Sequence, residues 1–194
     1  MPTPTRITPG SLRAAARTVL ERDGRDGLTM QAVATALGVR APSLYKHVRD
    51  RDDLIRVVVD DVSRELGDRL DLALAAAGAD PANAARALAA VARDFAHEHP
   101  HGYALVFGPL PGGSGPDRAA LDHGASAVLE AARRLAGEEH ALDAARTLTA
   151  WMHGFTSMEL AGAFRLGGEV DAAWAYGLER VVAGLAGDDD GSAA

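Results

Sequence analysis

Apolar side chains recur every three or four residues along most of the chain, a spacing typical of amphipathic α-helices. Thr8 and Pro9 form a helix start, and an apolar stripe from Leu12 to Leu20 follows until a stop at Gly24. Further helices are predicted at about 29–37, 42–48, 52–77, 82–98, 100–107, 117–136, 141–166 and 169–186. The chain is therefore predicted to be all-α, with about nine helices.

The second and third predicted helices are short and lie on either side of Gly38, a residue suited to the left-handed conformation at a helix C-terminus. Two short helices separated by a glycine-containing turn have the spacing of a helix-turn-helix. The predicted architecture is an N-terminal three-helix head at 1–51, followed by a C-terminal helical bundle at 52–187. A loop is predicted at 108–116 and a disordered tail at 188–194.

Composition supports a helical protein of the reducing cytosol. Alanine, the best helix former, accounts for 41 of the 194 residues, and the sequence has no cysteine. Disulfides, thiolate zinc sites and cysteine nucleophiles are thereby excluded. Charges interrupt every apolar run before the ~18 residues of a membrane span, and the first ten residues lack the apolar core of a signal peptide. A cytoplasmic protein with no membrane partner is expected.

Charge is distributed unevenly along the chain. The net charge is −7, which taken alone argues against binding to nucleic acid. Residues 1–51, however, hold nine basic and four acidic residues. A basic segment on an acidic remainder is expected when only that segment meets a polyanion. The alternative is an arginine-rich face that is merely solvated.

Polar side chains around the third predicted helix are candidates for DNA contacts. Arg40 can contact a guanine with its forked guanidinium, Pro42 can touch a thymine methyl group, and Lys46 projects one turn further along. Gln31 can reach a base. The candidates for phosphate contacts are Thr29, Ser43, Tyr45 and His47. In the alternative interpretation, the Tyr45 ring packs in the core and His47 is an ordinary surface residue.

The segment GLTMQAVATALGVRAPSLYKHVRDRDDLI at 27–55 resembles the DNA-binding head of the TetR transcriptional regulators. Its Leu-Thr start, Leu-Gly-Val turn and Leu-Tyr-x-His stretch carry the resemblance, and Val48 departs from it because many members have Phe there. The resemblance implies base contacts from Arg40 to Lys46, including Ala41, and phosphate contacts from Thr29, Ser43, Tyr45, His47 and Arg51. It also implies a homodimer on a palindromic double-stranded operator and control of transcription, most often repression.

The last two predicted helices are candidates for the dimer interface, because two antiparallel helices from each subunit can form a four-helix contact. The candidate interface residues are Leu148, Trp151, Leu160, Phe164, Trp174, Leu178, Val181, Val182 and Leu185. The alternative is that these side chains only fill the core of one chain. The stretch TAWMHGFTSMELAGAFRLGG at 149–168 resembles the Trp-x-His-Gly stretch of one TetR C-terminal subfamily, where it lies near the ligand cavity and the dimer contact.

A ligand pocket in such a bundle is expected to be lined by aromatic residues, methionines and a few polar groups. The candidates are Phe95, His99, Tyr103, Phe107, Met152, His153, Phe155, Met158 and Glu159. For each of them the alternative is plain core packing. The expected effector is a small apolar or amphipathic molecule that releases the protein from its operator.

Other classes of function find little support in the sequence. The motifs of phosphate-binding loops, serine hydrolases and zinc proteases are absent, so no enzyme and no cofactor are expected. The cluster HEHPH at 97–101 offers metal-ligating groups, but Pro100 interrupts the helical spacing that ligands need, and a solvated helix end is the alternative. A protein–protein adaptor that kept the head only as a fold is the third hypothesis, and the polar surface of the head argues against it.

Overall fold

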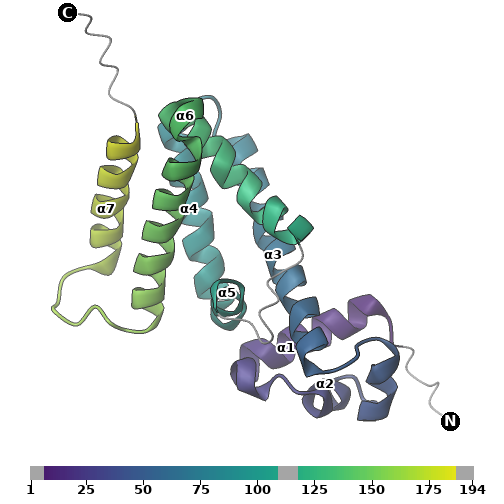
Figure 1. Cartoon of the computed structure of the whole chain (residues 1–194). Helices are drawn as coiled ribbons and strands as arrows, with labels where there is room; N and C mark the ends of the chain where they lie inside the picture. Colours follow the sequence, from purple (N-terminus) through teal and green to yellow (C-terminus); the bar gives the residue numbers. More distant parts are fainter. Residues whose placement is uncertain (1–6, 109–117, 187–194) are drawn as a thin grey trace, which may run out of the picture. The chain divides into compact units, whose positions relative to one another are not determined.

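Every regular element that the computed structural model describes, in residues 7–108 and 118–186, is a helix (Figure 1). The elements are α1 (Pro9–Gly27), α2 (Met30–Ala36), the 3-10 helix η1 (Ala41–Lys46), α3 (Arg51–Ala76), α4 (Pro81–Glu98), α5 (Pro100–Phe107), α6 (Arg118–Leu160) and α7 (Val170–Leu185). The prediction of an all-α chain is confirmed. No helix in the described part of the chain is both long enough and apolar enough to cross a membrane.

The predicted break between residues 136 and 141 lies inside α6. Gly137 has a φ of 78° and a ψ of 171°, so it divides α6 into two helical stretches. The second stretch ends at Leu160, earlier than the predicted residue 166. The reason is Gly162, whose φ of 61° lies in the left-handed region that closes a helix. Phe164 consequently lies outside the helix on which it was predicted.

The first of two compact units spans Met1–Glu65 and Glu98–Leu121. In this unit α1 packs against both α2 and α5, and α2 packs against η1. α1 begins where predicted: Thr8 Oγ1 accepts the N–H of Ser11 at 3.1 Å, and Ser11 Oγ accepts the N–H of Thr8 at 2.9 Å. The buried side chains of its apolar stripe are Leu12, Ala16, Val19 and Leu20, and those of α2, η1 and α3 include Val33, Leu44, Leu54, Ile55, Val58 and Val59.

The second unit spans Leu66–His97 and Asp122–Ala194. α4, the second stretch of α6 and α7 lie side by side in it (Figure 1). Side chains of α4, both stretches of α6 and α7 form one apolar cluster. The buried members are Ala85, Ala89, Leu135, Leu148, Met152, Trp174, Leu178 and Val182. Aromatic rings extend the cluster, since the centroid of Trp174 lies 4.9 Å from that of Trp151 and 5.2 Å from that of Phe155. α7 is therefore an integral part of this unit.

Packing divides the chain differently from the predicted boundary at residue 51. The start of α3 and all of α5 belong to the same unit as the first three helices. The assignment of DNA binding to 1–51 and of sensing and dimerisation to 52–187 is a functional one, and it stays a prediction. The predicted loop at 108–116, apart from Gly108, and the predicted tail at 188–194 lie outside the described residues.

Candidate nucleic-acid interface

α2 and η1 are joined by the predicted glycine turn. Thr29 begins α2, because its Oγ1 accepts the N–H of Ala32 at 3.1 Å. At the other end, Gly38 has a φ of 68°, and the N–H of Val39 donates to the oxygen of Ala34 at 2.9 Å. These local hydrogen bonds fix both ends of α2 and define how the chain enters η1.

The predicted third helix is present as the short 3-10 helix η1, which ends two residues before the predicted residue 48. The N–H of Ser43 donates to the oxygen of Arg40 at 2.9 Å, the hydrogen bond of a 3-10 turn. Side chains three positions apart nearly eclipse each other in such a helix. Ser43 and Lys46 therefore share one edge of η1, which brings a hydroxyl and an ammonium group together.

η1 has one apolar and one polar side. Leu44 is fully buried and Val48 is 2% exposed, so these side chains anchor the segment. Tyr45 is 58% exposed, which excludes the alternative that its ring packs in the core. Arg40 and Lys46 are also exposed, and neither forms an ion pair with any residue that the structure describes. The polar side thus presents two positive charges that are available to a partner.

The other predicted contact residues surround these two cations. Gln31, Pro42 and His47 are exposed, whereas Thr29, Ala41 and Ser43 are partly exposed. Although Thr29 Oγ1 accepts a hydrogen bond at the start of α2, its hydroxyl hydrogen is still available for donation. We call the whole surface the η1 face, comprising Thr29, Gln31, Arg40, Ala41, Pro42, Ser43, Tyr45, Lys46 and His47.

Arg51, a predicted phosphate contact, is engaged with backbone carbonyls of its own chain. Its Nε donates to the backbone oxygen of Leu28 at 2.8 Å, and its Nη2 donates to that of Arg25 at 2.6 Å. These hydrogen bonds tie the start of α3 to the end of α1 and satisfy carbonyl groups that a helix end leaves open. Because the guanidinium is partly buried and points at the backbone, Arg51 does not belong to the η1 face.

The geometry defines a class of protein. Two short helices are held by a glycine turn, with an apolar underside and an exposed cationic side, and this is a helix-turn-helix of the kind that enters a DNA groove. The chain is a helix-turn-helix DNA-binding protein with an all-helical second unit.

Comparison with known proteins identifies the family. The model for bacterial regulatory proteins of the tetR family matches residues 12–58, and the model for a tetracyclin repressor-like C-terminal domain matches residues 85–181. An uncharacterized HTH-type transcriptional regulator of Mycobacterium tuberculosis is 35% identical over 166 residues, which cover 82% of this chain and 73% of the relative. The chain belongs to the TetR family of transcriptional regulators. Members of this family bind DNA, are typically ligand-responsive repressors, and are not enzymes.

Solved structures have the same fold. A protein of unknown function from Rhodococcus sp. RHA1 superposes with a TM-score of 0.77 at 25% identity, over 96% of this chain and 100% of that one. A TetR variant from Acinetobacter baumannii, solved in complex with minocycline, gives a TM-score of 0.68 at 23% identity, over 93% and 97% of the two chains. The C-terminal family match includes the Trp-x-His-Gly stretch at 151–154, but the narrower subfamily stays a prediction.

The predicted pocket residues of the second unit have different environments. Phe95 and Met152 are buried in the core, at 0% and 5% exposed, so the core-packing alternative accounts for both. Phe155 and His153 are partly exposed on α6, and Met158 is exposed. Partial burial lowers the pKa of His153, because desolvation disfavours the charged imidazolium. Among the predicted pocket residues of this unit, His153, Phe155 and Met158 are therefore the accessible ones.

The remaining predicted pocket residues, His99, Tyr103 and Phe107, lie in the first unit. The Tyr103 and Phe107 rings are 4.8 Å apart on α5, and burial raises the pKa of Tyr103 to about 12. His99 Nε2 lies 3.7 Å from Glu65 Oε1, whereas His97 pairs with a carboxylate of the second unit. Across the described ranges, no three His, Cys, Asp or Glu side chains form a group that can hold a metal ion.

The sequence analysis missed Arg93, which organises an ion-pair cluster in the second unit. Its guanidinium donates to both carboxylate oxygens of Glu159, at 2.9 and 2.5 Å, and to Asp171 at 2.6 Å. The Trp174 ring lies 5.0 Å from its Cζ, and His97 Nε2 lies 3.3 Å from Glu159 Oε2. The hydrogen bond from Arg93 holds the pKa of Glu159 below its usual range. Glu159, predicted as a pocket residue, is thus engaged in joining α4, α6 and α7.

The predicted interface residues divide into core and surface. Four of them are already buried within one copy of the chain, so they offer little area to a partner: Leu148, Trp174, Leu178 and Val182. This burial favours the core alternative for these four, because they belong to one apolar cluster of the same unit. Three others pack partly buried against the same cluster: Trp151, Val181 and Leu185. Leu160 and Phe164 are exposed and stay candidates for an interface.

Proposed function

We propose that this chain is a homodimeric transcriptional repressor that binds a palindromic operator through the η1 face and is released by a small apolar or amphipathic effector. The observation that carries the proposal is the pair of cations Arg40 and Lys46, which are exposed beside the buried Leu44 and form no ion pair with the described residues. Such cations gain free energy from phosphate contacts, because binding releases counterions from DNA.

We assign base contacts and phosphate contacts to different members of the η1 face. Arg40 presents a guanidinium fork that suits the O6 and N7 acceptors of guanine, and Pro42 presents an exposed apolar group that suits the methyl group of thymine. Gln31, Ala41 and Lys46 are the other proposed base contacts. The proposed phosphate donors are Thr29, Ser43, Tyr45 and His47.

A dimer is part of the proposal because one short helix-turn-helix makes few contacts, whereas a two-fold pair binds two half-sites together. We place its interface on α7. An exposed hollow on this helix is lined by Ala175, Tyr176, Glu179, Arg180 and Ala183. The small alanines permit close approach of a partner helix, and the exposed Tyr176 ring can anchor it. The exposed Leu160 and Phe164 add apolar area on the same unit.

The proposed effector contacts are apolar groups with polar neighbours. On α6, the accessible Phe155 and Met158 accompany His153, a combination that suits an apolar molecule with one polar end. On α5, the exposed Phe107 ring offers a second contact, and it packs against the buried Tyr103 ring. Binding to either set releases DNA only if the effector has a higher affinity for the state that does not bind the operator.

The decisive experiment is selection of DNA fragments by the purified protein, followed by fluorescence anisotropy at several salt concentrations. We expect a specific complex with two chains per palindrome, and a log–log salt slope of about −0.9 for each phosphate neutralised. Sedimentation is expected to give a dimer, and Tyr176→Glu a monomer. Failure to select any fragment that binds specifically and salt-dependently would contradict the proposal, as would a stable wild-type monomer at the concentrations used for binding.

A further inference from the structure

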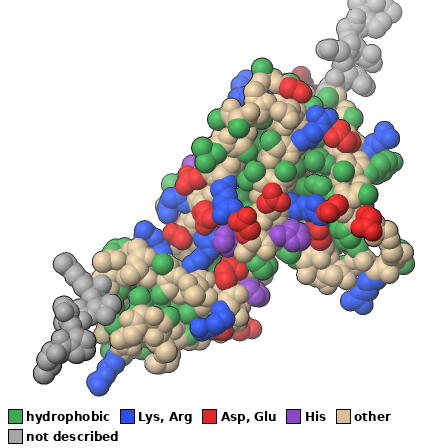
Figure 2. Space-filling model, turned by 180° about the vertical axis from the view of Figure 1, so that it is seen from behind, with side chains coloured by type: hydrophobic (Ala, Val, Ile, Leu, Met, Phe, Trp, Pro, Cys, Tyr) green, Lys and Arg blue, Asp and Glu red, His purple; other side chains and the backbone are tan. Residues whose placement is uncertain are grey.

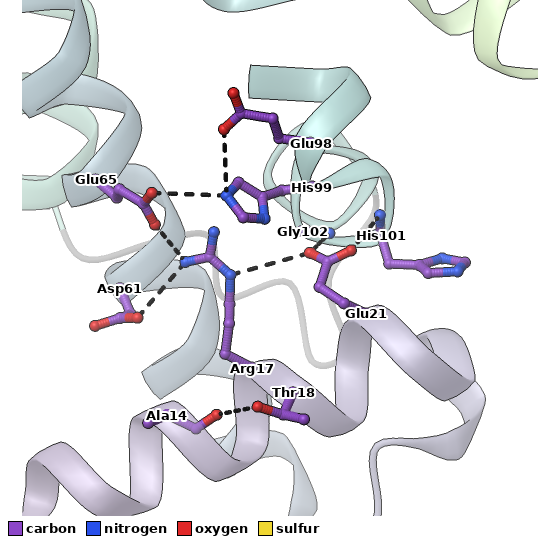
Figure 3. Close-up of polar contacts among 10 residues, drawn as sticks. All are labelled: Ala14, Arg17, Thr18, Glu21, Asp61, Glu65, Glu98, His99, His101 and Gly102. Carbon is purple, nitrogen blue, oxygen red and sulfur yellow. Dashed lines mark hydrogen bonds and ion pairs between the residues drawn. The ribbon is translucent and has the colours of Figure 1, made fainter. Parts of the chain in front are cut away.

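The first turn of α5 is capped by a carboxylate from another helix. His99, the residue that precedes α5, makes no capping hydrogen bond with its own side chain. Instead, Glu21 of α1 accepts the N–H of Gly102 at 2.9 Å and the N–H of His101 at 3.2 Å (Figure 3). These N–H groups have no partner inside the helix, so the carboxylate satisfies them and complements the positive end of the helix dipole.

The contact leaves no room for a side chain at position 102. A Cβ atom there would lie 2.8 Å from Glu21 Oε1 and 3.3 Å from Cγ2 of Val62 in α3. On the other side of the contact, α1 kinks at Gly24, whose φ is 69°, and a Cβ there would lie 3.5 Å from Cε1 of His101. Glycine at position 102 therefore lets α5 approach Glu21 closely enough for the cap to form, whereas glycine at position 24 is favoured by its left-handed backbone conformation.

Charged side chains around Glu21 join α3 to the same contact. The Arg17 guanidinium lies 4.0 Å from Glu21 Oε1, 2.9 Å from Glu65 Oε2 and 3.6 Å from Asp61 Oδ2 (Figure 3). His99 Nε2 lies 3.7 Å from the other oxygen of Glu65. The start of α5 therefore meets α1 and α3 in one cluster, which we call the α5 joint: Arg17, Glu21, Asp61, Glu65, His99 and Gly102.

A short hydrogen-bonded segment leads from the α5 joint to the η1 face. α1 ends at Gly27, six residues after Glu21. Around this end, the carbonyl groups of Arg25 and Leu28 accept hydrogen bonds from Arg51 of α3. Thr29, the first member of the η1 face, comes next and caps α2. Glu21 therefore contacts α5 just before the kink of α1 at Gly24, and the segment after the kink, held by Arg51, leads to the start of α2.

We propose that Glu21 is a positioning residue that couples α5 to the DNA-binding helices through the cap on the first turn of α5. This inference rests on the proposed function. Coupling is reciprocal: if binding of DNA to the η1 face stabilises α5, then whatever displaces α5 weakens binding of DNA by the same factor. α5 also carries the exposed Phe107, one of the proposed effector contacts, so a ligand on this ring would act on the capped helix directly.

Hydrogen exchange of the full-length chain, with and without its selected operator, tests this coupling. In the wild type we expect operator DNA to slow exchange of the His101 and Gly102 amides about tenfold, the scale of a charge-assisted hydrogen bond. In Glu21→Ala this slowing is lost at α5, while α2 and η1 are still protected by DNA. A merely structural role for Glu21 raises exchange at α5 in both states and leaves the effect of DNA unchanged.

Asp26→Ala is the matched control. Asp26 is an exposed acid on the same helix, and it forms no hydrogen bond or ion pair within the described ranges. Both variants remove one negative charge from the DNA-binding unit, so general electrostatic effects on DNA affinity are equal to first order. In Asp26→Ala we expect operator DNA to slow amide exchange at α5 as in the wild type. If both variants lose this slowing equally, the assignment to Glu21 is overturned.

Two further variants keep the test valid if Glu21→Ala does not fold. Glu21→Gln preserves the length of the side chain and one oxygen acceptor. We expect the slowing of α5 amide exchange by DNA in this variant to lie between those of the wild type and Glu21→Ala. Gly102→Ala leaves every charge in place but inserts a Cβ against the carboxylate, and it is expected to uncouple α5 as Glu21→Ala does. A wild-type complex that leaves α5 exchange unchanged overturns the inference alone, whereas the absence of any specific complex overturns the proposed function as well.

Discussion

The two cations of the η1 face differ from two arginines of the second unit, Arg86 and Arg93, in how their charge is used. Arg40 and Lys46 point outward and have no carboxylate partner among the described residues. In the second unit, Arg86 pairs with Glu179 at 2.7 Å, and Arg93 pairs with Glu159. Figure 2 shows basic and acidic side chains next to one another over much of the visible surface. The net charge of −7 therefore says little about DNA binding, because paired charges cancel locally and the unpaired ones do not.

The same distinction separates cations within the first unit. Arg51 donates to two backbone carbonyls, and Arg17 lies among carboxylates of α1 and α3. These arginines contribute to the positive charge of residues 1–51, but their geometry makes them structural. A count of basic residues overestimates the surface offered to DNA, and the count becomes informative only when the paired side chains are removed from it.

The largest expected effect comes from removing the unpaired cations. Arg40→Ala combined with Lys46→Ala is expected to weaken specific operator binding by about 100-fold or more, because it removes a base contact and a neighbouring cation. The log–log salt slope becomes shallower by about one for each phosphate that the variant no longer neutralises. Fluorescence anisotropy measures both quantities.

Arg146→Ala provides the control for that pair. Arg146 is exposed on α6, and its guanidinium lies 3.7 Å from Asp143 within the second unit. Because Arg146 is paired and lies outside the η1 face, we expect this variant to keep the operator affinity and the salt slope of the wild type. Equal losses in the two proteins would show that overall charge, and not the η1 face, determines binding.

Local signals explain why the helix-turn-helix could be predicted from the sequence. Thr8, Thr29 and Gly38 act through hydrogen bonds or backbone conformations that involve residues at most five positions away. The segment between Arg40 and His47 shows the limit of such signals. Over six residues, a spacing of three or four does not separate a 3-10 helix from an α-helix, and η1 is the former.

Interactions between distant parts of the sequence could not be predicted in the same way. Glu21 accepts hydrogen bonds from residues about 80 positions away, and Arg93 pairs with a carboxylate 66 positions away. Nothing in the local spacing of charges selects these partners. The apolar stripe of α7 poses a related problem, because the pattern indicates which side is buried but not what covers it. Trp174 and Leu178 face the core of their own chain.

Breaking a structural ion pair in the second unit is expected to lower the free energy of unfolding without changing DNA binding by the η1 face. Arg93→Ala leaves the partly buried Glu159 without its main partner, so we expect a loss of about 2 kcal/mol in the free energy of unfolding. Arg86→Ala is the matched control, because its pair with Glu179 is largely exposed and is expected to change stability little. Urea denaturation measures both values, and similar losses would mean that burial does not distinguish the two pairs.

Arg51→Ala is expected to have a smaller effect on the first unit. The substitution removes two hydrogen bonds to backbone carbonyls at the end of α1, for an expected loss of about 1–2 kcal/mol in the free energy of unfolding. The salt dependence of DNA binding by this variant is expected to match the wild type, since the guanidinium already donates to two backbone carbonyls. Arg49→Ala, which removes an exposed pair with Asp53, should leave stability nearly unchanged. A weaker salt dependence of DNA binding in Arg51→Ala would show that Arg51 does contact a phosphate.

The smallest predicted effect is a change in how stability depends on pH. Burial lowers the pKa of His153 in the folded chain below the ordinary value of 6.5, so the unfolded chain binds the proton more readily. The stabilising contribution of the neutral ring is therefore complete above pH 6.5 and is lost as the pH falls through the lower, folded pKa. We expect His153→Gln to lose less stability than the wild type between pH 7.5 and 5.5, and the exposed His140→Gln to behave like the wild type. Chemical denaturation at each pH measures the difference, and identical profiles for His153→Gln and the wild type would mean that partial burial of this ring does not affect folding.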